Sequence, residues 1–141
     1  MREGFILCYN EIMKEISNSI IAVFCTGLIY LLGGLDVSLT CLLIAIILDY
    51  VSGLVKAIVT KNLSSKIGVM GIIKKVSILL IVMLAVIIDK VTGNTGAIRT
   101  LVIYYFVANE GLSILENLGQ AGIPIPQGIK KTLKVMKKEN K

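Results

Sequence analysis

Charged residues divide this chain into four apolar stretches and a lysine-rich tail. The first stretch, residues 16–35, lies between Glu15 and Asp36 and consists of twenty uncharged residues. A helix needs about 20 apolar residues to cross a bilayer core of about 30 Å. The pattern therefore predicts a first membrane-spanning helix over residues 16–35.

The second apolar stretch follows almost at once and covers residues 37–55, with Asp49 as its one charge. Between the two stretches, Gly33 and Gly34 precede Asp36. Glycine adopts φ values that other residues avoid, so the pair predicts a tight turn. We expect this turn to return the chain across the membrane as a second span.

A polar segment, residues 56–75, separates the second stretch from the third, residues 76–88, which has only 13 uncharged residues. At 1.5 Å per residue such a helix covers about 20 Å, which is less than the bilayer core. It can span only if Lys74, Lys75 or Lys90 extends toward the lipid head groups. The alternative is a helix lying in the interface, which would leave three spans.

The fourth stretch, residues 100–118, is interrupted by Glu110 and Glu116. It predicts a fourth span with two intramembrane carboxyl groups. The alternative is a span that ends near Asn109 and continues as an amphipathic helix in the interface.

Lysine and arginine counts near the span ends predict the orientation. Residues 56–75 hold five lysines and residues 127–141 hold six, whereas the turn at Asp36 holds none and the other turn only Lys90 and Arg99. Four spans place both lysine-rich regions and both termini on one side of the membrane. The positive-inside rule makes that side cytoplasmic, whereas three spans would put the tail outside.

These patterns predict an all-α fold, a small multi-pass membrane protein with four spans, or three as the alternative, that assembles into oligomers. Pro124 and Pro126 end the helical part, because proline cannot continue a helix. We expect a transmembrane helical domain over residues 1–126 and a lysine-rich cytoplasmic tail over residues 127–141.

Composition supports a membrane protein and argues against an enzyme. Mean hydropathy is +0.85, with 55% hydrophobic and 17% charged residues, outside the usual soluble range. The net charge of +6 lies mostly beside apolar stretches, which favours anionic lipid head groups over nucleic acid as partner. The chain has no histidine, and its three cysteines form no C-x-x-C pair. We therefore expect no catalytic residues, no cofactor and no metal site.

Four residues of the second stretch share one face of the expected helix. Asp49, Ser52, Gly53 and Lys56 follow the spacing i, i+3, i+4 and i+7. A charge inside the bilayer is costly, so this face should meet other helices, water or a partner charge. It predicts a pore-lining or oligomer-contact face. The alternative is an Asp–Lys pair, or a protonated aspartate, that fixes this helix against a neighbour.

A second polar face surrounds Glu110, which lies eleven residues beyond Arg99 and about 16 Å along the helix axis. This depth is close to the middle of the membrane. The face extends over Asn109, Ser113, Glu116, Asn117 and Gln120. We expect it to line water or a contact between copies in an assembly.

The lysines on the expected cytoplasmic side form a third group. They are expected to set topology and to meet anionic lipid, with plain solvation of the tail as the alternative. The group comprises Lys74, Lys75, Lys130, Lys131, Lys134, Lys137 and Lys138.

Three segments give the sequence a family resemblance. They are DYVSGLVKA at residues 49–57, NLSSKIGVMGIIKKV at residues 62–76 and NEGLSILENLGQAGIPIP at residues 109–126. Together they resemble the phage-lysis and toxin-secretion holin family, which includes clostridial members encoded beside large toxins and many prophage holins of Gram-positive bacteria. The resemblance covers about residues 35–135. The last segment is the most specific, since a Glu-rich polar face followed by G-x-P-x-P is an uncommon way to end a span.

The resemblance implies a holin that homo-oligomerises in the bacterial cytoplasmic membrane and opens lesions through which an endolysin or a toxin escapes. An antiholin would be a further partner. Asp49, Asp89 and Glu110 fit this reading if an assembly shields or hydrates them. The alternatives are a non-lytic accessory subunit, an antiholin, or a small ion channel or transporter.

Overall fold

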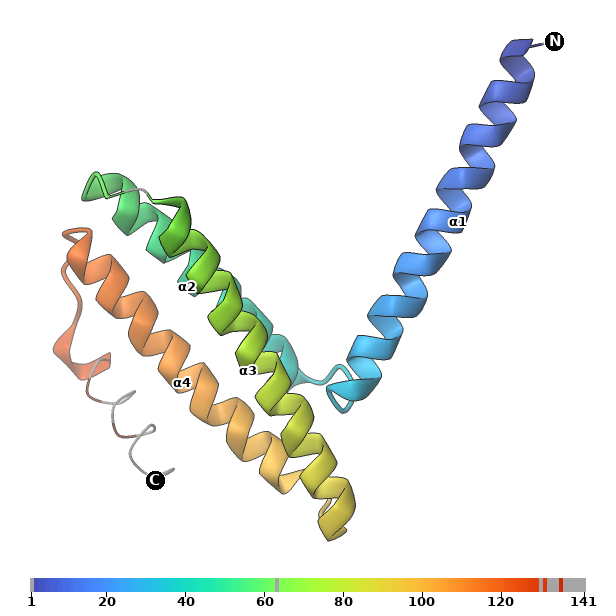
Figure 1. The fold of residues 1–141 in the computed structure, drawn as a ribbon. Helices are drawn as coiled ribbons and strands as arrows, with labels where there is room; N and C mark the ends of the chain where they lie inside the picture. Colours follow the sequence, from blue (N-terminus) through green and yellow to red (C-terminus); the bar gives the residue numbers. More distant parts are fainter. Residues whose placement is uncertain (1, 63, 130, 132–134, 136–141) are drawn as a thin grey trace. The chain divides into compact units, whose positions relative to one another are not determined.

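The computed structural model describes residues 2–62, 64–129, 131 and 135, and the described chain is all-α (Figure 1). Four helices in this part are long and apolar enough to span a membrane, which confirms the predicted fold class. They are α1 (Arg2–Leu31), α2 (Val37–Val59), α3 (Ser65–Thr92) and α4 (Ala97–Gln120). The chain divides into two units, Met1–Gly34 with α1 and Leu35–Lys141 with the other three helices.

Helix α1 is 30 residues long, and its most apolar part, Met13–Leu31, is the candidate span. The hydroxyl side chains of Ser17, Ser19 and Thr26 within this span bond to carbonyls of their own helix. The Thr26 hydroxyl, for example, donates to the carbonyl of Ala22 at 2.8 Å. The predicted turn after α1 is confirmed, because Gly33 and Gly34 have φ values of 84° and 95°.

Helix α2 begins at a side-chain cap. The carboxylate of Asp36 accepts a hydrogen bond from the N–H of Leu39 at 2.8 Å, which satisfies one of the free donors of the first turn. The helix continues to Val59, four residues beyond the expected end of the second stretch. Lys61, with a positive φ of 56°, follows in the connection to α3.

The expectation of a short third helix is wrong. Helix α3 has 28 residues and begins at Ser65, so Lys74 and Lys75 lie inside it rather than in a polar loop. Its candidate span, Gly68–Thr92, is the most apolar of the four despite these lysines. The helix is therefore long enough to cross the bilayer, and an interfacial third helix is not supported. Gly93 follows the last residue of the helix and caps it, and its φ of 71° is a value that glycine adopts easily.

Helix α4 is continuous from Ala97 to Gln120, so residues 110–120 continue the span and do not form a separate interfacial helix after Asn109. Gly122, with a φ of 90°, follows the helix. Pro124 and Pro126 come next and prevent the chain from resuming the helix at once. The N–H of Ile123 donates back to the carbonyl of Leu118 at 3.0 Å, which satisfies one of the last carbonyls of α4.

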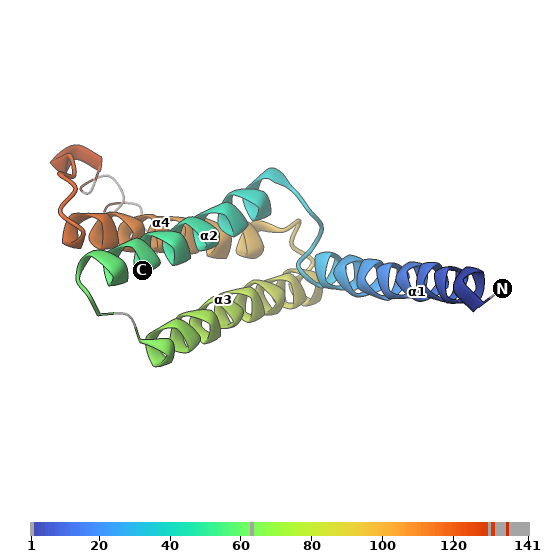
Figure 2. The same ribbon diagram turned by 90° about the horizontal axis from the view of Figure 1, so that it is seen from above.

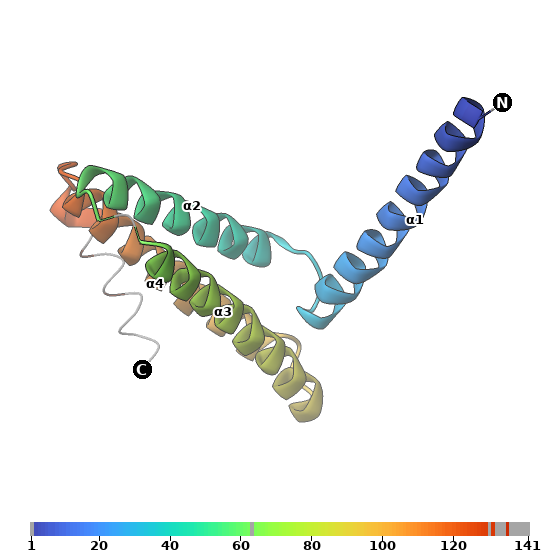
Figure 3. The same cartoon turned by 45° about the horizontal axis from the view of Figure 1, so that its top comes forward.

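In the unit Leu35–Lys141, α4 packs against both α2 and α3 (Figure 2). We call the two ends of this unit the Arg99 end, where α2 and α4 begin and α3 ends, and the Gln120 end, where α2 and α4 end (Figure 3). The buried apolar residues of α2 lie in the half of that helix nearer the Arg99 end, and those of α3 lie between its midpoint at Ile78 and the same end. They are Leu39, Leu42, Ala45, Ile78, Val82, Ala85 and Val86, joined from α4 by Ile103.

Candidate functional site

A buried polar network joins α2, α3 and α4 halfway along the unit. It consists of Asp49, Ser52, Lys56, Lys75, Glu110 and Asn117. The spacing of its residues within each helix explains how it forms, because those on α2 share one face and Glu110 and Asn117 are seven residues apart on α4.

Lys75 is the centre of the network. Its ammonium group lies 2.5 Å from a carboxylate oxygen of Asp49 on α2 and also pairs with the carboxylate of Glu110 on α4. The Lys75 side chain is 16% exposed, and the Asp49 and Glu110 side chains are 11% and 3% exposed. One cation on α3 therefore neutralises carboxylates from two other helices.

Asn117 connects the remaining members. Its amide nitrogen donates to Asp49 and to the hydroxyl of Ser52, each at 3.2 Å, and its amide oxygen accepts from the ammonium of Lys56 at 3.3 Å. The amide group uses both its donor and its acceptor capacity here. With two carboxylates and two ammonium groups, the network carries no net formal charge.

The three charged groups of the ion pairs lie at one depth. Asp49 is ten residues before the end of α2, Lys75 is ten residues after the start of α3, and Glu110 is ten residues before the end of α4. Each is therefore about 15 Å from the Gln120 end, near the middle of a bilayer core of about 30 Å. A single charge at this depth costs about 2.5–3.5 kcal/mol on insertion scales, so mutual pairing is what makes these residues tolerable.

The network corrects two expectations. Asp49 pairs with Lys75 of α3, not with Lys56 of its own helix, and Lys56 bonds to Asn117 instead. Asp49 and Glu110 also do not need an assembly of copies to shield them, because their partners belong to the same chain. Lys75, expected among the lipid-facing lysines, lies inside the unit for the same reason.

A second polar cluster closes the Arg99 end. The buried carboxylate of Asp89 on α3 accepts hydrogen bonds from the backbone N–H groups of Ile98 at 3.1 Å and Arg99 at 2.8 Å. Asp89 thus caps α4 from a neighbouring helix, where a negative charge also suits the helix dipole. Asp89, like Asp49, is accommodated within the chain.

The guanidinium of Arg99 completes this cluster by pairing with Asp36, the cap of α2, at 2.6 Å. The hydrogen bond from Arg99 lowers the pKa of the Asp36 carboxyl, and the bond from the Leu39 N–H acts in the same direction. The Asp36 side chain is 50% exposed, so water weakens this pair. In the sequence, Arg99 indicates only a basic residue near a span end, and its partners could not be inferred without the packing of the helices.

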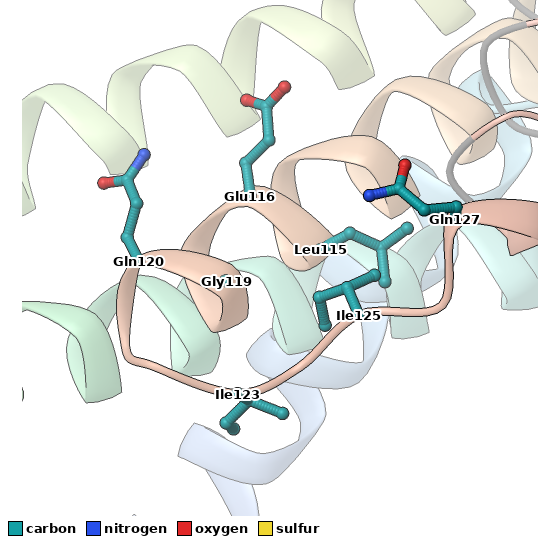
Figure 4. A pocket seen from close by; sticks show the side chains of 7 residues that line it. All are labelled: Leu115, Glu116, Gly119, Gln120, Ile123, Ile125 and Gln127. Carbon is teal, nitrogen blue, oxygen red and sulfur yellow. The ribbon is translucent and has the colours of Figure 1, made fainter.

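Three polar residues of α4 differ from the network. Ser113, Glu116 and Gln120 follow the spacing i, i+3 and i+7 and form what we call the open stripe. Ser113 is half-buried, Glu116 and Gln120 are exposed, and none has a hydrogen-bond or ion-pair partner in the described part of the chain. In Figure 4, Glu116 and Gln120 point away from Ile123 and Ile125, which lie on the other side of a cavity at the end of α4.

The remaining predicted site residues are dispersed. Gly53 lies against α4, since a Cβ there would be 3.6 Å from the amide nitrogen of Asn117. Lys74 on α3 and Lys131 in the tail are exposed. The other tail lysines predicted for this group, Lys130, Lys134, Lys137 and Lys138, lie outside the described residues.

Sequence comparison assigns the family. A family-wide profile described as "Bacteriophage holin family" matches residues 26–138, which include α2, α3, α4 and both polar clusters. The chain belongs to the bacteriophage holin family.

Individual relatives of this holin-family chain come from Gram-positive bacteria and a phage. The chain is 43% identical over 106 residues to an uncharacterized 14.9 kDa protein of Clostridium perfringens, covering 74% of this chain and 80% of that protein. It is 35% identical over 99 residues to a protein of Bacillus phage phi105 named "Probable holin", covering 70% and 73%. No solved structure matches the chain.

Proposed function

We propose that this protein is a holin. Several copies assemble in the bacterial cytoplasmic membrane and open lesions through which an endolysin or a toxin escapes. Membership in the holin family, the relative named as a holin and the four candidate spans support this function. An antiholin or a second holin-family chain would act on the same assembly.

The open stripe is the observation that carries the proposal. It runs for about 10 Å from the end of α4 into its candidate span, measured from Gln120 to Ser113. Three of the four acidic residues of α2–α4, Asp49, Asp89 and Glu110, have partners within the chain, whereas the Glu116 carboxylate has no partner among the described residues. Lipid offers such a stripe no hydrogen bonds, so it is best placed facing water between copies.

The rest of the surface suits lipid. Large apolar side chains are exposed along α2 and α3, including Ile44, Ile47, Val51, Leu80, Leu84, Ile87 and Val91. In an assembly these faces lie outward and the open stripes lie inward, so a ring or cluster of copies would surround a polar lesion. In this arrangement a lesion requires several copies, and a single unit would leave the membrane intact.

The proposed orientation follows from the four spans. Both termini lie in the cytoplasm, together with the connection between α2 and α3 and the lysine-rich tail, because basic residues are retained on that side. The Gln120 end then faces the cytoplasm, and the open stripe extends inward from that face.

Inducible expression in a bacterium that also makes a cytoplasmic endolysin tests this function. Membrane potential and endolysin activity outside the membrane are followed for the native chain and for the variant Ser113→Leu/Glu116→Leu/Gln120→Leu. The matched control is Thr40→Leu/Ser77→Leu, because both hydroxyls are exposed but already bond to carbonyls of their own helices.

We expect abrupt depolarisation with endolysin release for the native chain and the control, and a delay or loss of both for the stripe variant at equal membrane levels. Depolarisation without endolysin release would replace the large lesion by a small channel. A native chain that reaches the membrane and changes neither signal would refute the holin function.

A further inference from the structure

One part of α3 is held in place mainly by charge. From Ile78 onward α3 buries apolar residues such as Val82 and Ala85 against its neighbours. In residues 68–77, which we call the α3 arm, no described residue is buried, and the large apolar side chains there are exposed. Lys75 is the residue of the arm that reaches into the unit, since its side chain is only 16% exposed.

Near the start of the arm, α2 approaches without an ion pair. The hydroxyl of Tyr50 on α2 lies 4.0 Å from the position that a Cβ of Gly68 would occupy, which is an ordinary van der Waals distance. The arm also makes two ion pairs through Lys75, one to Asp49 on α2 and one to Glu110 on α4. These pairs lie in a region of low dielectric constant, where charge interactions are strong.

We propose that Lys75 is a latch. Its ion pairs hold the α3 arm against α2 and α4, and their loss releases the arm and so determines when the membrane opens. The timing part of this proposal rests on the proposed holin function, whereas the release of the arm does not.

Release would enlarge the polar surface of α4. Glu110, Ser113 and Asn117 follow the spacing i, i+3 and i+7, so the network residues of α4 adjoin the open stripe. With the arm in place, Glu110 is covered by its pair with Lys75. Without it, the polar face would extend from Gln120 to Glu110, about 15 Å, and would reach the middle of the bilayer.

The neighbouring lysine provides the control. Lys74 is also in the α3 arm and carries the same charge, but it is exposed and has no partner in the described part of the chain. Lys75→Met removes the latch, Lys74→Met removes an equal charge beside it, and Lys75→Arg keeps a cation at the latch position.

The first experiment measures the arm directly. Spin labels are placed at Val59→Cys on α2 and Val69→Cys in the arm, both exposed positions, after Cys8, Cys25 and Cys41 are changed to serine. The full chain is reconstituted in vesicles of phosphatidylethanolamine and phosphatidylglycerol, and the label distance distribution is recorded. We expect Lys75→Met to raise the long-distance population about tenfold or more, and the Lys74→Met and Lys75→Arg distributions to match the native one.

A second variant keeps the test decisive if Lys75→Met misfolds. Lys75→Met leaves two buried carboxylates without a cation, which can prevent insertion. The triple variant Lys75→Met/Asp49→Asn/Glu110→Gln removes all three charges together and is measured alongside. An unchanged label distance in the inserted triple variant would overturn the latch.

Onset of lysis then separates the two proposals. Earlier onset for Lys75→Met than for Lys74→Met supports the latch as a timing element. If the native chain lyses cells but the label distances and the onset are the same for both variants, the latch is refuted and the holin function stands. If Lys75→Met releases the arm but neither the native chain nor the variant permeabilises cells, the latch as a structural element stands and the holin function falls.

Discussion

The cap that α3 provides for α4 allows a quantitative prediction. Replacing Asp89 with alanine removes the acceptor for two backbone N–H groups, those of Ile98 and Arg99, in a region where the Asp89 side chain is buried. Loss of a helix cap costs about 0.5–2 kcal/mol, and each hydrogen bond to a charged group contributes about 1.5–3 kcal/mol. Because these contributions overlap, we expect Asp89→Ala to lower the free energy of unfolding by about 2–4 kcal/mol.

Two measurements check this value. Titration of the purified protein in mixed micelles with sodium dodecyl sulfate gives the free energy of unfolding. Hydrogen exchange reports the two amides individually, and a loss of about 2 kcal/mol would speed their exchange about 30-fold. Asp89→Asn should lose less than half as much, because its amide oxygen still accepts one hydrogen bond.

The control is Asn94→Ala in the same connection, since the Thr92 hydroxyl nearby is the one partner of the exposed Asn94 side chain among the described residues. We expect this variant to stay within about 0.5 kcal/mol of the native protein. The reasoning would be refuted if Asp89→Ala unfolded like the control, or if the exchange of the Ile98 and Arg99 amides did not change.

Two further predictions concern single residues of α2. Gly53→Ala should leave the free energy of unfolding unchanged or raise it by up to about 1 kcal/mol, because its Cβ would lie at ordinary contact distance from Asn117 and alanine favours helix. Gly53→Leu should lower the free energy of unfolding, because the larger side chain disturbs the contact with α4. Equal stability of the two variants would contradict this. The pKa of Asp36 is lowered by Arg99, so its contribution is complete above the ordinary carboxyl range and is lost as pH falls through the lowered value. The stability difference between the native protein and Asp36→Asn should therefore be constant near neutral pH, remain below about 1 kcal/mol for this half-exposed pair, and shrink below about pH 4. A difference that is equal at about pH 3 and pH 7 would rule out this origin.

The spacing of charges predicted where the first, second and fourth candidate spans lie, because insertion in a bilayer depends on the apolar length of each segment. It also predicted the turn at Gly33 and Gly34, where local backbone freedom decides the conformation. The third span shows where this reasoning fails. Its expected start after Lys75 assumed that a lysine ends an apolar helix, but α3 includes this lysine because two carboxylates of other helices neutralise it.

The sequence by itself therefore determined the helical class and the shared face of Asp49, Ser52, Gly53 and Lys56, which follow from the pattern along single segments, while it left three or four spans open. Only the tertiary structure decided which charges pair. Lys75 and Glu110 are 35 residues apart, and nothing local to either selects the other. The same packing encloses Glu110, because Lys75 of α3 pairs with it, and leaves Glu116, six residues along the same helix, without a partner in the described chain.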